Sequence, residues 1–244
     1  MDSITKQLMK LNLKKNDTVL IHSSLKQINR DAILLISELL DYFSDGMVLM
    51  PTHTWKTMTP DNNHYDPEVE PSCVGLLTEI FRNFPGVIRS LHPTHSMAGF
   101  GNKAAKYLSQ AEDDQTPCSP TGAWGRLSEI DATILLVGCG FERNTFIHAI
   151  EEKNNVPNRF TEKPIEFLIK TNKKWIKRDF YKHYNAQFVH LSENYKLIEE
   201  AVINDGIVKV GKFGDADCLI FKAKELEEYV MNLLQQNLNF FTEI

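Results

Sequence analysis

The stretch LLVGCGFERNTFIHAIEE, residues Leu135–Glu152, decides the fold that we expect. Its apolar start, which closes on a Gly-Cys-Gly turn, predicts a buried strand that ends abruptly. A helix is predicted to begin at Phe146, and either Asn144 or Thr145 could cap it, because a short polar side chain accepts a hydrogen bond from a free backbone N–H. The stretch therefore predicts a strand, a tight turn and a helix with a histidine near its start.

His148 falls in the first turn of this predicted helix, where the positive helix end disfavours a charged imidazole. Glu151 and Glu152 lie three and four residues further on, share its face and favour the charged form. A histidine balanced in this way can be neutral near neutral pH, as a general base must be. The other interpretation is a capped helix with a histidine that is satisfied within the fold, and this stretch alone does not separate the two.

Length and composition indicate a globular protein. A chain of 244 residues can form one large domain or two small ones, and 42% of it is hydrophobic. No linker, internal repeat or low-complexity tract divides it, so we expect a single domain over residues 1–244. The sequence does not indicate whether this domain works as a monomer or as a homodimer.

Charge and cysteine content narrow the classes of partner. The formal net charge of −5 gives nucleic acid no electrostatic attraction and mildly favours cationic ligands. No apolar run approaches the roughly 18 residues of a membrane span, and the N-terminus lacks the apolar core of a signal peptide. The four cysteines contain no CxxC pair, so neither a zinc knuckle nor a disulfide framework is predicted. We expect a cytoplasmic protein that binds neither nucleic acid nor membranes.

The first part of the chain alternates between strands and helices. Thr18–Ile21 and Met47–Met50 are predicted buried strands, and Asp31–Phe43 between them has helical spacing, which favours neighbouring, parallel strands. Ser23 and Ser24 follow the first strand, at the end where α/β folds usually bind ligands. A solvated turn is the alternative interpretation of these two serines.

Pro51–Ser72 has a different character, with four prolines and the aromatic residues Trp55 and Tyr65 among polar residues. A long loop of this kind inside a compact domain is usually functional. We interpret it as one wall of a binding site. Ser72 is expected to cap a helix that runs to about Phe84.

The segment GVIRSLHPTHSMAGFG, residues Gly86–Gly101, is too rich in Gly, Pro, His and Ser for a regular element and too apolar for a solvated loop. It is therefore expected to be buried but irregular, and such backbone needs polar partners. The side chains that can supply them are Arg89, Ser90, His92, His95 and Ser96.

The remainder of the chain predicts a second group of strands and helices. The expected elements are meander strands over 159–169, 174–181 and 186–191, a helix from Ser192 to about Ile203, a hairpin of 207–210 with 218–221, and a helix over 224–236. Together with the first part they indicate a layered α/β fold whose sheet is mixed in strand direction.

Five stretches, in order, resemble the aminoglycoside 3-N-acetyltransferase family. They are DTVLIHSSL (17–25), MPTHTW (50–55), DPEVEPSCVGLLTEIFRNFPGVIRSLHPTHSMAGFG (66–101), SPTGAWGRL (119–127) and LLVGCGFERNTFIHAIEE (135–152). The resemblance implies a three-layer α/β/α fold with a mixed central sheet. It also implies transfer of an acetyl group from acetyl-coenzyme A to a primary amine, which in the family sits on an aminocyclitol ring.

The resemblance and the helix position together make His148 the candidate general base. Family members usually carry acidic residues after a tryptophan in the meander, and one such carboxylate assists the histidine. Here only Asp179 follows Trp175 closely. We expect Asp179 or Glu151 to orient the imidazole, with Asp179 preferred.

The resemblance also suggests cofactor and acceptor residues. Candidates for contact with coenzyme A are Ser23, Ser24 and Leu25 at the pantetheine arm, Arg89, His92 and Ser96 in or behind its channel, and Ser119 at the thioester or as a helix cap. A cationic acceptor needs carboxylates and flat walls, for which the candidates are Asp66, Glu142, Glu151, Glu152, Trp55 and Tyr65. No metal ion is expected.

Several alternatives stay open at this point. The acceptor could be an amino sugar, free or nucleotide-linked, of glycan biosynthesis, because the last third of the chain matches the family less well and the chain is short. The chain could bind coenzyme A without catalysis, and Cys139 could act as a nucleophile rather than as a small packing residue. A metallohydrolase is the remaining rival, with a metal set drawn from His53, His64, His92 and His95.

Overall fold

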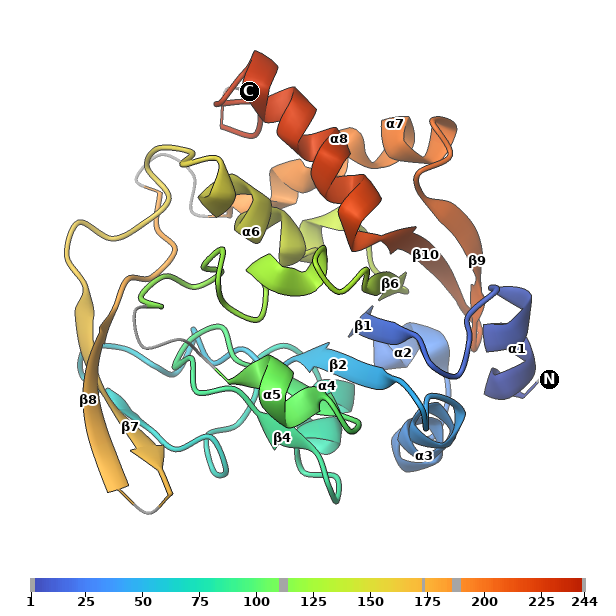
Figure 1. The fold of residues 1–244 in the computed structure, drawn as a ribbon, viewed down its shortest axis with the longest axis horizontal. Coiled ribbons are helices and arrows are strands. Elements are labelled where there is room, and N and C mark those ends of the chain that lie inside the picture. The colour runs from blue at the N-terminus through green and yellow to red at the C-terminus, as the bar shows by residue number, and fades with distance from the viewer. Residues whose placement is uncertain (1–2, 110–113, 173, 186–189, 243–244) are drawn as a thin grey trace.

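The computed structural model describes residues 3–109, 114–172, 174–185 and 190–242 (Figure 1). These residues form a seven-stranded sheet in the order β4-β5-β2-β1-β6-β10-β9 and a three-stranded sheet in the order β3-β7-β8. The strands are β1 (Thr18–Ser23), β2 (Met47–Pro51), β3 (His64–Tyr65), β4 (Ile88–Arg89), β5 (Met97–Phe100), β6 (Thr133–Val137), β7 (Ile165–Thr171), β8 (Lys174–Phe180), β9 (Lys209–Phe213) and β10 (Ala216–Lys222).

The large sheet is mixed, as the sequence predicts. β1 is parallel to both of its neighbours, with Val19 opposite Val48 of β2 and opposite Thr133 of β6. β10 runs antiparallel to β6 and β9, and β5 runs antiparallel to β2 and β4. The predicted parallel pairing of the first two strands is confirmed.

Both faces of the large sheet are covered, which confirms the three-layer α/β/α prediction. Successive side chains of a strand point to opposite faces, so Leu20 packs into one hydrophobic cluster while Val19 and Ile21 pack into the other. A strand buried on both sides must be apolar throughout, which explains the unbroken apolar runs of β1, β2 and β6. Figure 1 shows α6 and α8 on one side of this sheet and α3 on the other.

The helices divide between the two clusters. The first cluster receives side chains from α5 (Ala104–Leu108), α6 (Phe146–Lys153), α7 (Glu199–Asn204) and α8 (Ala223–Gln236). The second receives them from α1 (Ile4–Lys10), α2 (Leu25–Ile28), α3 (Ala32–Tyr42) and α4 (Leu76–Arg82). Short 3-10 turns η1 (Gly125–Leu127), η2 (Phe141–Arg143) and η3 (Leu191–Ile198) complete the described elements.

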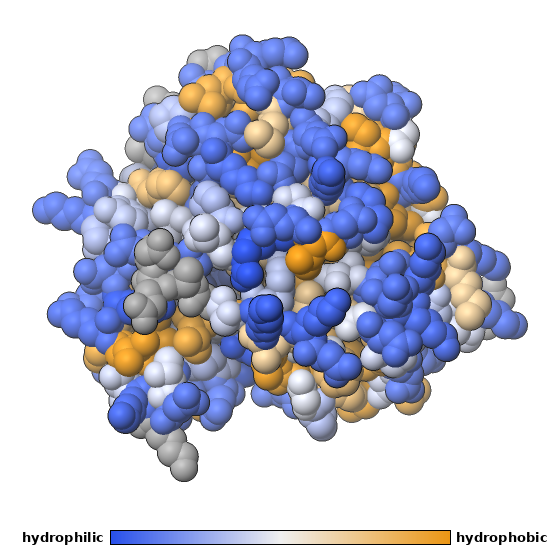
Figure 2. Space-filling view, viewed as in Figure 1, coloured by the Kyte–Doolittle hydropathy of each residue, from blue (hydrophilic) through white to orange (hydrophobic). Residues whose placement is uncertain are grey.

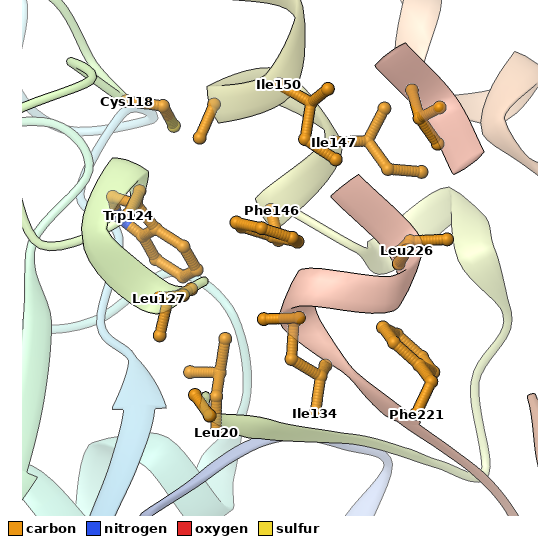
Figure 3. Packing of buried hydrophobic residues seen from close by; sticks show 14 of the residues in the cluster. Leu20, Cys118, Trp124, Leu127, Ile134, Phe146, Ile147, Ile150, Phe221 and Leu226 are labelled. Carbon is orange, nitrogen blue, oxygen red and sulfur yellow. The ribbon is translucent and has the colours of Figure 1, made fainter. Parts of the chain in front are cut away.

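The packing of α6 fixes the position of His148. Phe146, Ile147 and Ile150 are fully buried in the first cluster, where Figure 3 shows Phe146 between Trp124 and the helix that carries Leu226. Each such apolar side chain contributes about 1.5–3 kcal/mol through burial. Because these residues anchor one side of the helix, His148 is held on another side.

Two element boundaries differ from the sequence-based expectation. Ser72 does not cap α4, which begins at Leu76 after Gly75. Gly75 has a φ of +133°, a conformation that glycine adopts at little cost, so the chain turns there before the helix can start. The expected strand from Arg159 begins only at Ile165, and Phe160 forms an isolated bridge with His183.

The expected strand over 186–191 falls mostly on residues 186–189, which lie outside the described residues; the chain that follows enters η3 at Leu191. The expected helix from Ser192 to Ile203 is η3 followed by α7, and the expected hairpin and last helix are β9–β10 and α8. All four cysteines lie in the described residues and are free.

None of the helices in the described residues is both long and apolar enough to span a membrane. Figure 2 shows one face of the molecule, on which hydrophilic residues predominate and apolar residues are scattered in small groups.

Candidate active site

A cleft of about 1130 Å³ opens at the carboxyl ends of β1 and β6. These strands are neighbours, and the chain leaves β1 for β2 on one side but returns to β6 on the other, so the cleft lies where the strand order changes direction. Open α/β sheets bind their ligands at such a point. Ser23 and Ser24 line the cleft from β1, and Gly138 and Cys139 line it from β6.

Gly138 shapes the floor of the cleft. Its φ is +66°, and a Cβ at this position would lie 2.6 Å from the side chain of Gln27. Its N–H donates to the carbonyl of Asp217 (2.8 Å), and the N–H of Ser24 donates to the carbonyl of Val137 (2.8 Å). Only glycine fits this position without strain, so backbone geometry explains the first glycine of the Gly-Cys-Gly sequence.

The start of α6 carries His148 into the cleft. Thr145 is the N-cap residue but makes no capping bond, and Asn144 instead accepts the N–H of Phe146 through Oδ1 (3.3 Å). The hydroxyl of Thr145 lies 3.1 Å from Nε2 of His53. Of the two predicted caps, Asn144 therefore serves the helix and Thr145 faces the site.

Three side chains surround Nδ1 of His148. The hydroxyl of Tyr195 lies 2.6 Å away, Nη2 of Arg159 lies 2.7 Å away, and a carboxylate oxygen of Glu151 lies 3.5 Å away. Tyr195 donates a short hydrogen bond to Glu151, and Arg159 donates to the same oxygen (2.6 Å). With Nδ1 occupied by the chain, Nε2 is the nitrogen left for a ligand in the cleft.

The pKa of His148 lies well below its usual value, first because burial disfavours the imidazolium and second because the Arg159 guanidinium repels it. The imidazole is therefore neutral at physiological pH, as a base requires. Burial raises the pKa of Glu151, while the adjacent Arg159 and the hydrogen bond from Tyr195 act in the opposite direction. The 2.6 Å contact with Arg159 supports an ionised Glu151.

A row of histidine rings extends from His148. The ring of His183 lies 4.3 Å from that of His148, His95 lies 4.8 Å from His183, and His53 lies 4.7 Å from His95. Burial lowers the pKa of each of these rings, to about 3 for His183. All four line the cleft, which is therefore walled by neutral imidazoles.

The possible metal-binding groups differ from the predicted rival set. Among the described residues, the group whose donor atoms converge is Cys118, Glu152 and His183, all within 4.8 Å of one another. In this structure Nε2 of His183 is 2.9 Å from Oε1 of Glu152, so these two side chains are paired with each other. His64 stands apart from the other histidines of the rival set, on β3 against Trp175.

Several predicted residues are brought together in the cleft. Those that line it are Ser23, Ser24, Leu25, Trp55, Glu142 and His148. They come from the end of β1, the start of the Pro-rich loop, η2 and α6, so elements far apart in sequence meet at one edge of the sheet.

Four predicted cofactor residues do not line the cleft. Arg89 donates to the carbonyl of Thr52 (2.5 Å) and to Oγ of Ser96 (3.0 Å), so both side chains brace the exit of β2. Nδ1 of His92 accepts backbone N–H groups within its own loop. Ser119 donates to buried Asp114 (2.7 Å). The segment 86–101 is mostly buried from Ser90 onward, as expected, but it is irregular mainly between β4 and β5, which form two strands of the large sheet that were not predicted from the sequence.

The remaining predicted acceptor and catalytic residues are also occupied elsewhere. Tyr65 is fully buried in β3, and Asp66 accepts from Lys170 (2.6 Å). Glu152 is paired with His183 behind the cleft. Asp179 lies on β8 in a separate depression with Lys177 and Arg178, whereas Glu151 is the predicted carboxylate that lies beside His148.

Three residues of the site were not predicted as site residues. Arg159 follows α6 in a turn, Tyr195 belongs to η3, and His183 follows β8. Tyr195 lies in the stretch that was predicted as a helix from Ser192, and nothing in that stretch indicates the contact between its hydroxyl and His148. Their meeting depends on the tertiary path of the last third of the chain, which no local pattern encodes.

The family profile described as aminoglycoside 3-N-acetyltransferase matches residues 20–235, which is most of the chain. The chain belongs to the aminoglycoside 3-N-acetyltransferase family. The resemblance seen in the sequence motifs is confirmed, and the profile extends into the last third, where the motifs are weaker. As an aminoglycoside 3-N-acetyltransferase family member, the chain is an acyltransferase-type enzyme.

Relatives of the family match along most of their length. The SPbeta prophage-derived aminoglycoside N(3')-acetyltransferase-like protein YokD of Bacillus subtilis (strain 168) is 27% identical over 259 residues, which cover 93% of this chain and 89% of that protein. A crystal structure of an AAC(3)-IVa mutant in complex with a gentamicin has a TM-score of 0.83 at 23% identity, covering 99% and 90% of the two chains. The structure of AAC-IIIb bound to CoASH has a TM-score of 0.83 at 19% identity, and the match covers 96% of this chain and 95% of that one.

Proposed function

We propose that this protein transfers the acetyl group of acetyl-coenzyme A to a primary amine on an aminocyclitol or amino-sugar ring, with His148 as general base. The 3-amino group of an aminoglycoside is the acceptor that the family name supplies. The observation that carries the proposal is a neutral His148 in the cleft at the ends of β1 and β6, with Nδ1 in contact with the hydroxyl of Tyr195 and, through it, Glu151.

The reaction needs a base because an amine near neutral pH is mostly ammonium, which cannot attack. Nε2 of His148 removes a proton from the amine, and Nδ1–H donates to the oxygen of Tyr195, which itself donates to Glu151. The extra proton of the ammonium has by then been lost to water, so it is the neutral amine whose nitrogen bonds to the thioester carbonyl carbon as Nε2 takes its proton. The carbon–sulfur bond breaks, the imidazolium returns that proton to the leaving thiolate, and the neutral amide is left. General-base assistance of this kind is worth about 100- to 10,000-fold in rate.

The cleft residues fit coenzyme A chemically. Oγ of Ser23 is buried without a hydrogen-bond partner in the described structure, and it borders the cleft, where an amide of the pantetheine arm could satisfy it. Lys26 and Arg143 also line the cleft and offer cations for the phosphates. A volume of about 1130 Å³ can hold the arm and an acceptor ring together.

Complexes of two relatives support both substrates. AAC-IIIb binds CoASH, and the AAC(3)-IVa mutant binds a gentamicin. We infer by family membership that this chain uses acetyl-coenzyme A as donor. Since acetyl-coenzyme A is made and consumed inside cells, we expect the reaction to take place in the cytoplasm.

A thiol-release assay tests the proposal. The wild-type protein, acetyl-coenzyme A and a panel of primary amines should release free thiol, and His148→Gln should lower the rate at least about 100-fold. Retained binding of coenzyme A by calorimetry would establish that the variant is folded. If the variant is as active as the wild type, His148 is not the base. If the wild type binds coenzyme A but acetylates no amine, the chain is a binding protein and not a transferase.

A further inference from the structure

We propose that the acceptor is an amino sugar with a single primary amine, whose other groups are neutral or anionic, rather than a polycationic aminoglycoside. This inference rests on the proposed function, since it assigns the acceptor of the same reaction. It follows from the charges that surround the cleft.

Carboxylates are scarce around the cleft. Among the described residues that line it, Glu142 is the one carboxylate, whereas the cations are Lys26, Arg143, Arg159 and Lys182. Glu142 accepts the N–H of Gly140 (3.2 Å), and its nearest cation, Arg143, is 3.9 Å away. Glu142 can therefore receive one ammonium group, and the described lining offers no second carboxylate to match another.

Three of the acids predicted for a cationic acceptor are already engaged within the chain. Asp66 accepts from Lys170 (2.6 Å), Glu151 from Arg159 (2.6 Å), and Glu152 lies 2.9 Å from Nε2 of neutral His183. Glu151 is fully buried and Glu152 is nearly so, so an ammonium group would have to be desolvated as well as displace an internal partner. Displacing Arg159 from Glu151 would break a buried ion pair, which is strongly unfavourable.

One cation at the cleft adds direct repulsion. Arg143 lies near two acids, Glu142 at 3.9 Å and Glu193 at 3.6 Å, which offset its charge. Lys182 donates to the carbonyls of Trp55 (3.2 Å) and Met58 (2.9 Å), so its charge is held in place without a carboxylate. Like charges brought together at an interface repel each other. An acceptor with several ammonium groups meets this repulsion, whereas an acceptor with a phosphate is attracted.

The uncharged part of the lining suits a sugar ring. Trp55 and Tyr184 are both exposed in the cleft, with 40% and 56% of their surface accessible, and offer flat walls. Ser192 lines the same cleft, and its hydroxyl can donate to or accept from a hydroxyl group of the sugar. One carboxylate, two aromatic walls and neutral polar groups together match a ring with one amine and several hydroxyls.

Competing acceptors test the inference. The purified full chain is given acetyl-coenzyme A with glucosamine, glucosamine 6-phosphate or UDP-glucosamine in one set, and with kanamycin or gentamicin in the other. We expect kcat/KM for the best single-amine sugar to exceed that for either aminoglycoside at least about 10-fold, with the gap widening at low salt because screening weakens. Comparison of the three sugars distinguishes a free, a phosphorylated and a nucleotide-linked acceptor. A higher kcat/KM with either aminoglycoside overturns the inference and leaves the proposed function standing.

Binding gives a readout that does not depend on turnover. Each amine is titrated by calorimetry into the coenzyme A complex of His148→Gln. If the wild type acetylates no amine, the proposed function is wrong. If an aminoglycoside binds more tightly than the sugars in this titration, the inferred acceptor class is wrong, whatever the turnover shows.

Charge variants examine the carboxylate itself. Glu142→Gln should raise KM for the single-amine sugar about 10-fold with little change in kcat, because it removes one charge-assisted contact that forms on binding. Glu193→Gln is the matched control, since Glu193 also pairs with Arg143 but does not line the cleft, and it should leave KM unchanged. Equal KM values for Glu142→Gln and the control would refute the role of Glu142.

Discussion

Nη2 of Arg159 lies 2.7 Å from Nδ1 of His148. A guanidinium is always a donor, so when this bond is made Nδ1 accepts and the neutral ring carries its proton on Nε2. Base catalysis needs the other tautomer, in which Nδ1–H donates to Tyr195 and Arg159 keeps its bond to Glu151 (2.6 Å). Arg159 thus controls both the charge and the tautomer of the candidate base.

We predict that Arg159→Gln shifts the pH dependence of the reaction. The active form is neutral His148, so kcat/KM falls as pH drops through the pKa of this histidine, which burial and Arg159 together hold well below its usual value. Without Arg159 the carboxylate of Glu151 is left to stabilise the imidazolium. The acid limb should therefore move to higher pH by about one unit or more.

Profiles of kcat/KM from about pH 5 to about pH 9 measure this shift. Arg178→Gln, on β8 in the separate depression, is the matched arginine control and should retain the wild-type limb. Superimposable profiles for Arg159→Gln and wild type would mean that Arg159 does not act on His148.

The two candidate carboxylates can be separated by a pair of amide substitutions. Glu151→Gln removes the charge that Tyr195 and Arg159 share beside His148, and we expect kcat to fall at least about 10-fold. Asp179→Asn, on β8, should leave kcat within about twofold of wild type because Asp179 lies outside the cleft. Steady-state kinetics at saturating donor make the comparison, and a larger loss in Asp179→Asn would restore the preference drawn from the sequence.

Cys139 is predicted to be dispensable. Burial, followed by the charge of Glu142, raises the pKa of its thiol to about 12, so almost none of it is the nucleophilic thiolate near neutral pH. We expect Cys139→Ser to keep wild-type kcat within about twofold, and rapid mixing of wild type with acetyl-coenzyme A alone should give no burst of thiol. A stoichiometric burst that disappears in Cys139→Ser would instead establish an acyl-enzyme.

The sequence predicts the sheet better than it predicts the site, for physical reasons. β1, β2 and β6 are buried on both faces, so their apolar runs are dictated by the layers around them, and Ser23 is predictable because it ends such a run. His148 is predictable from its place in the first turn of a helix and from the family resemblance. Arg159 and Tyr195 contact His148 from a turn and from η3, and their own neighbours in sequence carry no trace of that contact. Arg89 is the opposite case, because the sequence singled it out as a site residue. In the structure it bonds mainly to backbone carbonyls, which any sequence could provide. The number of charged residues can be read from the sequence, but which of them pair cannot. Glu151 pairs with Arg159 and Glu152 with His183, and these pairings change the acceptor that we expect.

Buried neutral histidines should make the protein sensitive to mild acid. Burial lowers the pKa of His22, His92 and His183 to about 3 in the folded protein, from an unfolded value of 6.5. Between these values the unfolded chain binds protons that the folded chain does not, so the free energy of unfolding falls as pH drops below 6.5. At about pH 5.5 each such histidine costs about 1.4 kcal/mol relative to neutral pH.

Urea unfolding near pH 7.5 and near pH 5.5 measures this loss. These three histidines together predict a decrease of about 4 kcal/mol, and the lowered pKa values of buried His53, His95 and His148 add to it. His22→Leu removes one titrating group, so the difference between the two pH values should shrink by about 1.4 kcal/mol whatever the variant does to stability near neutral pH. His64→Gln is the control, because His64 is the exposed residue of β3, and this substitution should leave the difference unchanged. The same pH difference in His22→Leu as in wild type would show that His22 is protonated without cost in the folded protein, and that its place at the end of β1 is open to water.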